Sequence, residues 1–299
     1  LHEMPGGYAH NARAMYGLAA KAEALGVRII SGITVKALES DNSHAITAVD
    51  TDRGRIDCDY AVVAAGPWVR SFWEMLELPM EVGIRNPATR EVTEGIPMWI
   101  YWSLQEGTLG VDPNLQVTND GAMPPVIHVD TDAPLYSDED GRLITDQLWG
   151  IYYKPDFHFG GVQGGAAPFI VDKPAADVSV DPYGPASPEF VVGAEFAEMW
   201  VSALAHCQER FSGTLPQFKK EPSGGIGAFT PDSFTVFDSM RENCFVIADS
   251  NHGYKMIGVG ELVAQTICGD KPGLLDPFRF SRYAEGDLHP VSNSPFPWS

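Results

Sequence analysis

An uninterrupted apolar run at residues 60–66 is the sequence feature that most restricts what this chain can fold into. The run reads Tyr-Ala-Val-Val-Ala-Ala-Gly, and Pro67 and Trp68 follow it directly. Small and β-branched side chains without alternating polar positions are typical of a parallel strand that is buried on both faces. Parallel strands need crossover connections, which are usually helices, so the run predicts an α/β architecture. We expect the strand to end at Gly66 and Pro67, where the backbone must turn sharply.

The part of the chain before this run predicts a helix followed by extended segments. From Asn11 onward, apolar residues recur at helical spacing as far as Leu25, and Gly26 then provides a left-handed C-terminal stop. Extended segments are expected at residues 27–30, 33–35, 45–51 and 55–59. The last two flank a short polar turn that contains glycine, a pattern typical of a β-hairpin.

The end of the chain returns to the same α/β pattern. A glycine-rich turn is expected from Gly224, and the apolar residues 244–248 predict a buried strand. A glycine-containing loop then leads to a helix that is expected at residues 258–268. Loop amides and a helix N-terminus present partial positive charge, which suits an anion such as the reduced ring of a flavin. The alternative is an ordinary strand, loop and helix with no ligand.

The middle of the chain, residues 78–222, has a different character. It is rich in proline, aspartate and aromatic residues, and apolar residues share one face of a helix expected at 188–211. Extended stretches are expected at residues 98–104, 126–129 and 149–153. We therefore expect an antiparallel sheet covered by a helix, inserted between two α/β blocks at residues 1–77 and 223–299.

Charge and cysteine usage narrow the classes of function. The chain of 299 residues has 40 acidic and 20 basic residues, giving a formal charge of −20. Such a chain repels phosphate backbones and anionic lipids, so neither nucleic acid nor a membrane is an expected partner. No apolar run approaches the ~20 residues of a membrane-spanning helix. The 4 cysteines are scattered without metal-ligand spacing, so we expect a cytoplasmic protein with reduced thiols and no metal site.

Three motifs together carry a resemblance to a known family. They are the strand end at residues 64–68, the Thr-Pro-Asp sequence at 230–232 and the Asn-His-Gly-Tyr-Lys loop at 251–255. In this order and spacing they resemble the flavin-dependent D-amino-acid oxidase and sarcosine oxidase family. The resemblance implies an α/β (α+β) fold. Residues 1–77 and 223–299 would form the second part of an FAD-binding Rossmann-like domain, and residues 78–222 a substrate-binding domain with an antiparallel sheet.

The resemblance also implies FAD as the cofactor and assigns roles to individual residues. Lys255 is expected at the flavin edge, where it would hold a substrate carboxylate or tune the flavin N5, although a solvated loop lysine is the alternative. His252 would cap the same loop or face the ring. The residues expected to bind FAD are Val35, Ala64, Ala65, Gly66, Trp68, Gly225, Gly227, Asn251, Gly253, Tyr254, Lys255 and Met256.

One departure from the family concerns the start of its fold. The family opens with a GxGxxG fingerprint that holds the FAD pyrophosphate, and no such fingerprint follows a strand in this sequence. We therefore expect a second polypeptide to supply this unit, either as another subunit of a hetero-oligomer or as the other product of a cleaved precursor. A truncated chain would have the same sequence.

Other departures concern the flavin and the substrate. Gly225 occupies the position of a cysteine that links flavin covalently in some members, so no covalent link is expected there. His158 takes the place of an oxygen-activating lysine in a strand facing the flavin, which puts reaction with O2 in doubt. The alternative for His158 is a satisfied core residue. No arginine lies at residues 219–232, where D-amino-acid oxidases clamp a carboxylate.

The resemblance implies oxidation of the C–N bond of an amine or an amino acid by hydride transfer to FAD, and the missing arginine favours an amine or N-substituted amino acid over a plain amino acid. There are two alternatives. The chain could oxidise a 2-hydroxy acid, or it could be a non-catalytic structural subunit of a flavoenzyme complex. Aromatic residues that would either line an apolar amine pocket or form core are Trp99, Tyr101, Tyr152 and Tyr153.

Overall fold

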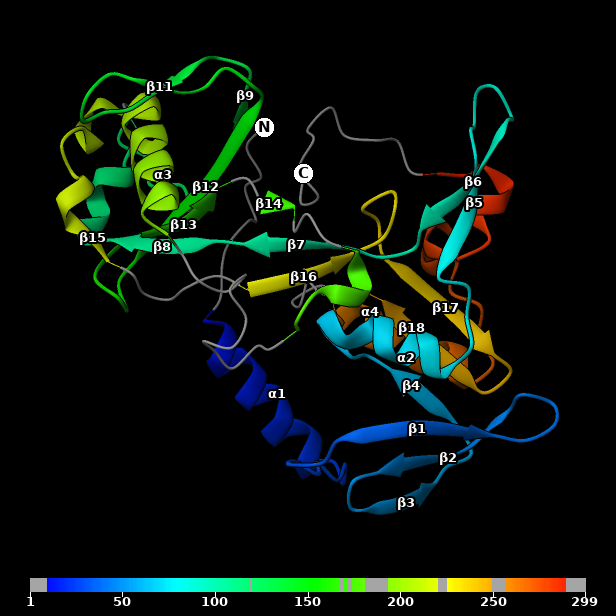
Figure 1. Cartoon of the computed structure of the whole chain (residues 1–299). Coiled ribbons are helices and arrows are strands. Elements are labelled where there is room, and N and C mark those ends of the chain that lie inside the picture. The colour runs from blue at the N-terminus through cyan, green and yellow to red at the C-terminus, as the bar shows by residue number, and fades with distance from the viewer. Residues whose placement is uncertain are drawn as a thin grey trace. The chain divides into compact units, whose positions relative to one another are not determined.

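The computed structural model describes residues 10–118, 120–166, 169–170, 174–180, 193–219, 225–248 and 256–288. Contacts between Cα atoms divide the chain into two compact units (Figure 1). Unit 1 comprises Leu1–Thr34, Gln105–Ala167 and Val192–Gly224, and unit 2 comprises Val35–Leu104, Pro168–Val191 and Gly225–Ser299. These divisions fall elsewhere than the boundaries expected after residues 77 and 222. Contacts do not test which part binds cofactor or substrate, so those two assignments stay predictions.

The centre of unit 2 is a three-stranded sheet in the order β17-β18-β4. Strand β18 (Cys244–Ala248) pairs antiparallel with β17 (Val236–Arg241) and parallel with β4 (Ala61–Val63). The strand expected at 244–248 and the parallel strand are therefore confirmed. Burial of β4 on both faces is wrong, because the Val62 side chain is 45% exposed in the described structure. Only its neighbours Ala61 and Val63 pack into the core, so the strand alternates.

Helices cover part of this sheet. Helix α4 (Met256–Ile267) packs Val259 and Val263 against Phe237, Phe245 and Ile247 of β17 and β18. Helix α2 (Val69–Met75) follows the 3-10 turn η1 (Gly66–Trp68) and buries Trp73 beside the ring of Trp99, with the centroids 5.4 Å apart. The remaining elements at this end are η7 (Gly273–Phe278) and α5 (Arg282–Glu285).

Further strands of unit 2 form three small sheets. The predicted hairpin is confirmed as β2 (Ile46–Thr51) and β3 (Gly54–Asp57), with β1 (Val35–Ser40) alongside β2. Strands β5 (Glu81–Arg85) and β6 (Val92–Pro97) form a second pair. Strand β7 (Ile100–Leu104) lies between β14 (Phe169–Ile170) and β16 (Gly225–Phe229). The expected turn is therefore wrong for residues 225–229, because Ile226, Ala228 and Phe229 are buried along a strand.

Unit 1 contains a five-stranded antiparallel sheet in the order β15-β8-β13-β12-β9. These strands are Phe218–Lys219, Glu106–Leu109, Gly161–Ala166, Trp149–Asp156 and Ile127–Thr131, respectively. Helix α3 (Ala194–Cys207) packs Phe196, Trp200 and Leu204 into a core with strand residues such as Ile151 and Val162. The predicted antiparallel sheet with a covering helix is confirmed. Shorter elements of unit 1 are the pair β10 (Leu135–Tyr136) and β11 (Leu143–Thr145), and η2 (Pro113–Gln116), η5 (Glu209–Phe211) and η6 (Leu215–Gln217).

The first helix of the chain, α1, is also confirmed. It spans Asn11–Ala24 and is blue in Figure 1. Gly26 follows with a φ of 93°, the left-handed conformation expected for its stop. The segments expected to be extended at residues 27–30 and 33–34 form no regular strand among the described residues. No helix in the described part of the chain is long and apolar enough to cross a membrane.

Candidate functional site

The candidate site begins where two parallel strands of unit 2 end. Val63 of β4 lies opposite Val246 of β18, so both strands direct their carboxyl ends to the same edge of the sheet. The chain leaves β4 through Ala64 and Ala65, and it leaves β18 after Ala248. Ligands of open α/β sheets bind in the crevice at the carboxyl ends of such strands.

Gly66 shapes the exit from β4. Its φ of 54° is a left-handed conformation that favours glycine, and a Cβ placed there would meet no atom within 4 Å. The exposed Ala64 and half-buried Ala65 are equally short, so the backbone at this edge is accessible to a flat ligand. Trp68, at the end of the same turn, is 37% exposed.

A buried tyrosine fixes this turn to the neighbouring sheet. The Tyr101 hydroxyl on β7 donates a 2.9 Å hydrogen bond to the Pro67 carbonyl. Burial raises the pKa of Tyr101 to about 12, so the phenol stays a donor at neutral pH. Tyr101 and Trp99 belong to the core of unit 2, which is the second of the two expected roles for these aromatic residues.

The Thr-Pro-Asp motif lies beside the end of β18. Residues on both sides of the motif and the last residue of β18 line one small hollow, namely Ala228, Phe229, Thr230, Ser233, Phe234, Thr235 and Ala248. Strand β16, which leads into the motif, also contacts the η1 turn. Segments far apart in sequence, around residues 66, 230 and 248, are thus gathered within unit 2.

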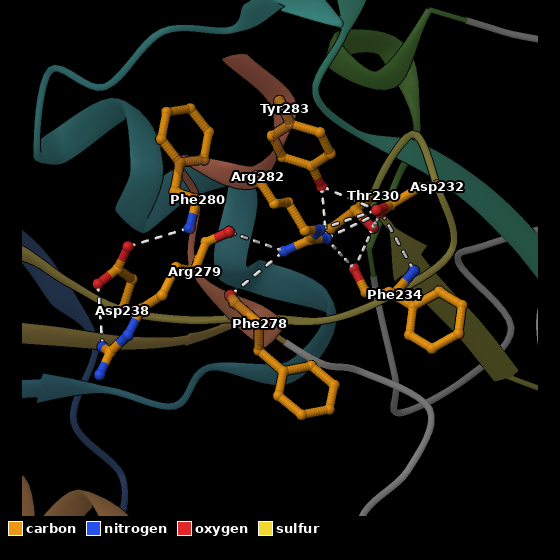
Figure 2. Close-up of polar contacts among 9 residues, drawn as sticks. All are labelled: Thr230, Asp232, Phe234, Asp238, Phe278, Arg279, Phe280, Arg282 and Tyr283. Atoms are coloured by element: carbon orange, nitrogen blue, oxygen red, sulfur yellow. Dashed lines mark hydrogen bonds and ion pairs between the residues drawn. The ribbon is translucent and has the colours of Figure 1, made fainter. Parts of the chain in front are cut away.

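Figure 2 shows how the motif is held. Arg282 grips the Asp232 carboxylate with two hydrogen bonds of 2.8 Å, one from Nε and one from an Nη. The Asp232 and Arg282 side chains are only 6% and 2% exposed. The Thr230 hydroxyl has one proton to donate, and two acceptors lie within its reach, an Asp232 oxygen at 3.0 Å and the Phe234 carbonyl. The turn is therefore closed by a buried, two-pronged ion pair.

This pairing decides the charge state of both groups. Burial acts to raise the pKa of Asp232, but the hydrogen bonds and the charge of Arg282 outweigh it and hold the pKa below its ordinary value. Arg282 also donates to the carbonyls of Phe234, Phe278 and Arg279 and to the Tyr283 hydroxyl (Figure 2). Because its donors are engaged in this way, the Arg282 guanidinium stabilises the fold and has no donor left for a substrate carboxylate.

Sequence reasoning missed Arg282 altogether. It follows Asp232 by 50 positions and lies in the four-residue helix α5, outside every motif that the sequence presents. The only signal was the absence of an arginine at residues 219–232, which left the Asp232 carboxylate without an obvious partner.

The loop residues of the predicted site lie outside the described residues. These are Asn251, His252, Gly253, Tyr254 and Lys255, and the side chain of Met256 is outside them as well, although Met256 begins α4. Val35 begins β1. Gly225 and Gly227 lie on β16, next to the Thr-Pro-Asp motif in the chain.

His158 does not lie in a strand, so that part of its prediction is wrong. It is exposed in the turn between β12 and β13 of unit 1. The Asp156 carboxylate accepts backbone N–H bonds from His158 and Phe159, at 2.9 and 2.8 Å, and this closes the turn. The His158 ring meets His10 edge-on at 4.9 Å. Its exposure also excludes the alternative of a buried core histidine.

The described residues at the edge of unit 2 fit FAD as a ligand. Short side chains and an open Gly66 allow a flat ring to approach the backbone. Helix α4 follows β18 in the chain, and the N–H groups in the first turn of a helix favour a negative charge. Among the described residues, no group of three or more acidic, histidine or cysteine side chains is arranged to hold a metal ion.

Comparison with known proteins supports this interpretation. Residues 1–92 match a family described as FAD dependent oxidoreductase. No curated protein matches the chain in sequence. L-proline dehydrogenase from P. horikoshii has a similar structure, with a TM-score of 0.61 and 19% identity over 92% of this chain and 60% of its own. Glycine oxidase from Geobacillus kaustophilus matches with a TM-score of 0.54 and 18% identity over 89% of this chain and 56% of its own.

A third protein of similar structure is named for a different substrate. Fructosyl amine:oxygen oxidoreductase (Amadoriase I) from Aspergillus fumigatus has a TM-score of 0.55 and 14% identity, over 96% of this chain and 58% of its own. The chain therefore spans 60% or less of the length of these three proteins, and at such identities they show the fold. Residues 1–92 and the fold of the chain are therefore similar to those of FAD-dependent oxidoreductases, a family whose members bind FAD.

Proposed function

We propose that this chain is part of an enzyme that oxidises the C–N bond of an amine or N-substituted amino acid with FAD. The observation that carries the proposal is the gathering of the β4 exit, the Thr-Pro-Asp motif and the end of β18 within unit 2. The three similar structures are named for oxidation of proline, glycine and a fructosyl amine, all of which contain a C–N bond.

The residues that would hold FAD are those at the strand ends. Ala64, Ala65 and Gly66 leave the backbone open, Trp68 offers an exposed aromatic ring, and Gly225 and Gly227 lie on the strand that leads to the Thr-Pro-Asp motif. Bound FAD would supply the acceptor for a hydride from the carbon next to nitrogen, and the iminium ion left on the substrate would be hydrolysed by water. The chain itself contributes binding and orientation, which lower the barrier by positioning.

Lys255 and His252 would act on the substrate side of this proposal. Lys255 would hold a substrate carboxylate or an edge of the cofactor by its charge, and His252 would orient the loop that contains both residues. His158 has no assigned part in this proposal, because it is an exposed turn residue.

The proposal includes a polypeptide that carries the GxGxxG unit. Large apolar side chains on and after α1 are exposed in the described structure, namely Met15, Tyr16, Leu18, Leu25, Val27, Ile29 and Ile30. An exposed apolar patch of this kind marks an interaction surface. We propose that the dinucleotide-binding unit packs on these residues. Leu18→Glu should abolish co-purification of that polypeptide, whereas Leu143→Glu, at an exposed leucine elsewhere in unit 1, should not.

The experiment that tests the function is anaerobic reduction of the natively purified protein. Flavin absorbance near ~370 and ~450 nm should accompany the protein, and the ~450 nm band should bleach on addition of an N-methyl amino acid. If only 2-hydroxy acids bleach the band, the substrate class is 2-hydroxy acids and not amines. A colourless preparation that contains both polypeptides would contradict the proposal.

A further inference from the structure

Four residues form one row across the sheet of unit 1. Tyr152 on β12 lies opposite His128 on β9 and Gly165 on β13, and Gly165 lies opposite Glu106 on β8. Directly opposed residues of antiparallel strands project from the same face of the sheet. Tyr153, the neighbour of Tyr152, points into the core with α3. The row therefore lies on the face of the sheet opposite to α3.

Tyr152 connects the two ends of this row. Its ring stacks on His128 with the centroids 5.7 Å apart and the planes inclined by 26°. Its hydroxyl donates a hydrogen bond to Glu106 Oε1. A Cβ at Gly165 would lie 2.7 Å from the Tyr152 ring and 2.8 Å from its hydroxyl. Glycine at this position is thus what allows the ring to cross β13 and reach Glu106.

The Glu106 carboxylate has only neutral hydrogen-bond partners among the described residues. Gln163 Nε2 donates to its Oε2 at 3.4 Å, a second neutral donor, and Glu106 forms no ion pair in the described part of the chain. Lys154, the nearest cation along this face of β12, pairs with Asp156 at 2.8 Å. Burial, followed by the charge of Glu106, raises the pKa of Tyr152 well above its ordinary value, so the phenol remains a neutral donor.

His128 adds no compensating charge at neutral pH. Desolvation of the ring, opposed by the charge of Asp130, lowers the pKa of His128. Next to Glu106 on the same face, Thr108 is fully buried, and its hydroxyl has no hydrogen-bond partner among the described residues. The half-buried Glu106 carboxylate is thus oriented by two neutral donors and lies beside an unsatisfied hydroxyl. This arrangement suits a cationic ligand that has a further polar group.

We propose that Glu106 is the counter-ion that binds the ammonium group of an amine substrate, with Tyr152 and Gln163 as the positioning residues of its carboxylate. This inference rests on the proposed function and assigns the recognition of its substrate. The ligand class is a small primary or secondary alkylammonium ion. A carboxylic acid or a neutral alcohol of the same size lacks the charge that Glu106 would recognise.

The test measures binding of tert-butylammonium chloride to the full chain by calorimetry. This ion has no hydrogen on the carbon next to nitrogen, so it binds without being oxidised, and tert-butanol is its neutral counterpart. We expect wild type to bind the ammonium and not the alcohol. Glu106→Gln should weaken binding by about tenfold, because the amide still accepts from Tyr152 but has no charge. Glu106→Asp, which keeps the charge, should retain more affinity than Glu106→Gln.

The matched control is Asp146→Asn, which removes one negative charge from an exposed residue of the same unit. It should leave the affinity unchanged, and thereby separates Glu106 from general attraction to an acidic protein. Equal affinities in wild type and Glu106→Gln, or equal losses in Glu106→Gln and Asp146→Asn, would overturn the inference. If Glu106→Gln does not fold, Tyr152→Phe replaces it, with an expected loss of about threefold.

Failure of this inference is distinguishable from failure of the proposed function. If an amine bleaches the flavin equally fast in wild type and Glu106→Gln, the function stands and the role of Glu106 is wrong. If tert-butylammonium binding depends on Glu106 while no amine bleaches the flavin, the binding site stands and the function is wrong.

Discussion

The Asp232 carboxylate and the Arg282 guanidinium form a buried ion pair with two contacts of 2.8 Å, although 50 positions separate them in the chain. This pair ties the Thr-Pro-Asp motif beside the end of β18 to the short helix α5. It explains why an aspartate is present in the motif without assigning that aspartate to substrate or cofactor.

Breaking this pair should destabilise the protein strongly. Asp232→Asn leaves the Arg282 guanidinium buried without a counter-ion, and we expect a loss of about 3 kcal/mol in the free energy of unfolding. Urea denaturation followed by tryptophan fluorescence measures it. Glu39→Gln, which breaks an exposed pair with Arg55, should cost less than about 1 kcal/mol. Equal costs for the two variants would show that the buried pair has no special role.

The same pair should make stability depend on pH in the acid range. The pKa of Asp232 is lower in the folded than in the unfolded chain, so protonation favours the unfolded state. Its contribution should be complete at pH values above the unfolded pKa of ~3.9 and should be lost as pH falls through the lower, folded pKa. The difference in free energy of unfolding between wild type and Asp232→Asn should therefore shrink on acidification. A difference in free energy that stays constant from pH 6 to pH 3 would contradict this assignment.

Local sequence patterns predicted the elements that depend on neighbouring residues. The hairpin of β2 and β3 was predictable because its turn and its two strands lie within one short segment. Helix α1 was predictable from apolar spacing and from the left-handed Gly26 that follows it. Strand β18 was predictable because all five of its residues are apolar and buried.

Elements that depend on distant partners were not predictable in this way. Strand β16 begins with Gly-Ile-Gly, which is typical of a turn, and becomes a strand because it pairs with β7, more than a hundred positions earlier. Likewise, the row from His128 to Glu106 exists only through the register of four strands. The turn at His158 depends on the Asp156 side chain, which is a local signal in the sequence. The resemblance to the family had instead suggested a strand there.

Gly66→Ala should separate backbone strain from cofactor binding. A left-handed φ of 54° costs an alanine about 1 kcal/mol, and the added methyl group also projects into the open space at the β4 exit. We expect lower thermal stability together with a lower ratio of flavin to protein absorbance. Gly121→Ala is the matched control, since Gly121 also has a positive φ, of 84°, and open surroundings but lies in unit 1, on an exposed turn. Equal flavin content in the two variants would remove Gly66 from the cofactor site.

Lys255→Met tests the residue expected to act on the substrate. Loss of the ammonium group would remove an electrostatic contact to the substrate carboxylate or the cofactor, and we expect the rate of anaerobic flavin reduction to fall by about a hundredfold. Stopped-flow absorbance near ~450 nm measures this rate, and the flavin content of the purified variant shows whether the cofactor is still bound. Lys271→Met is the control at an exposed lysine, and substrate should reduce its bound flavin at the wild-type rate. A near-wild-type rate for Lys255→Met would exclude Lys255 from the site, whereas loss of flavin without a change in rate per bound flavin would make it a cofactor-binding residue alone.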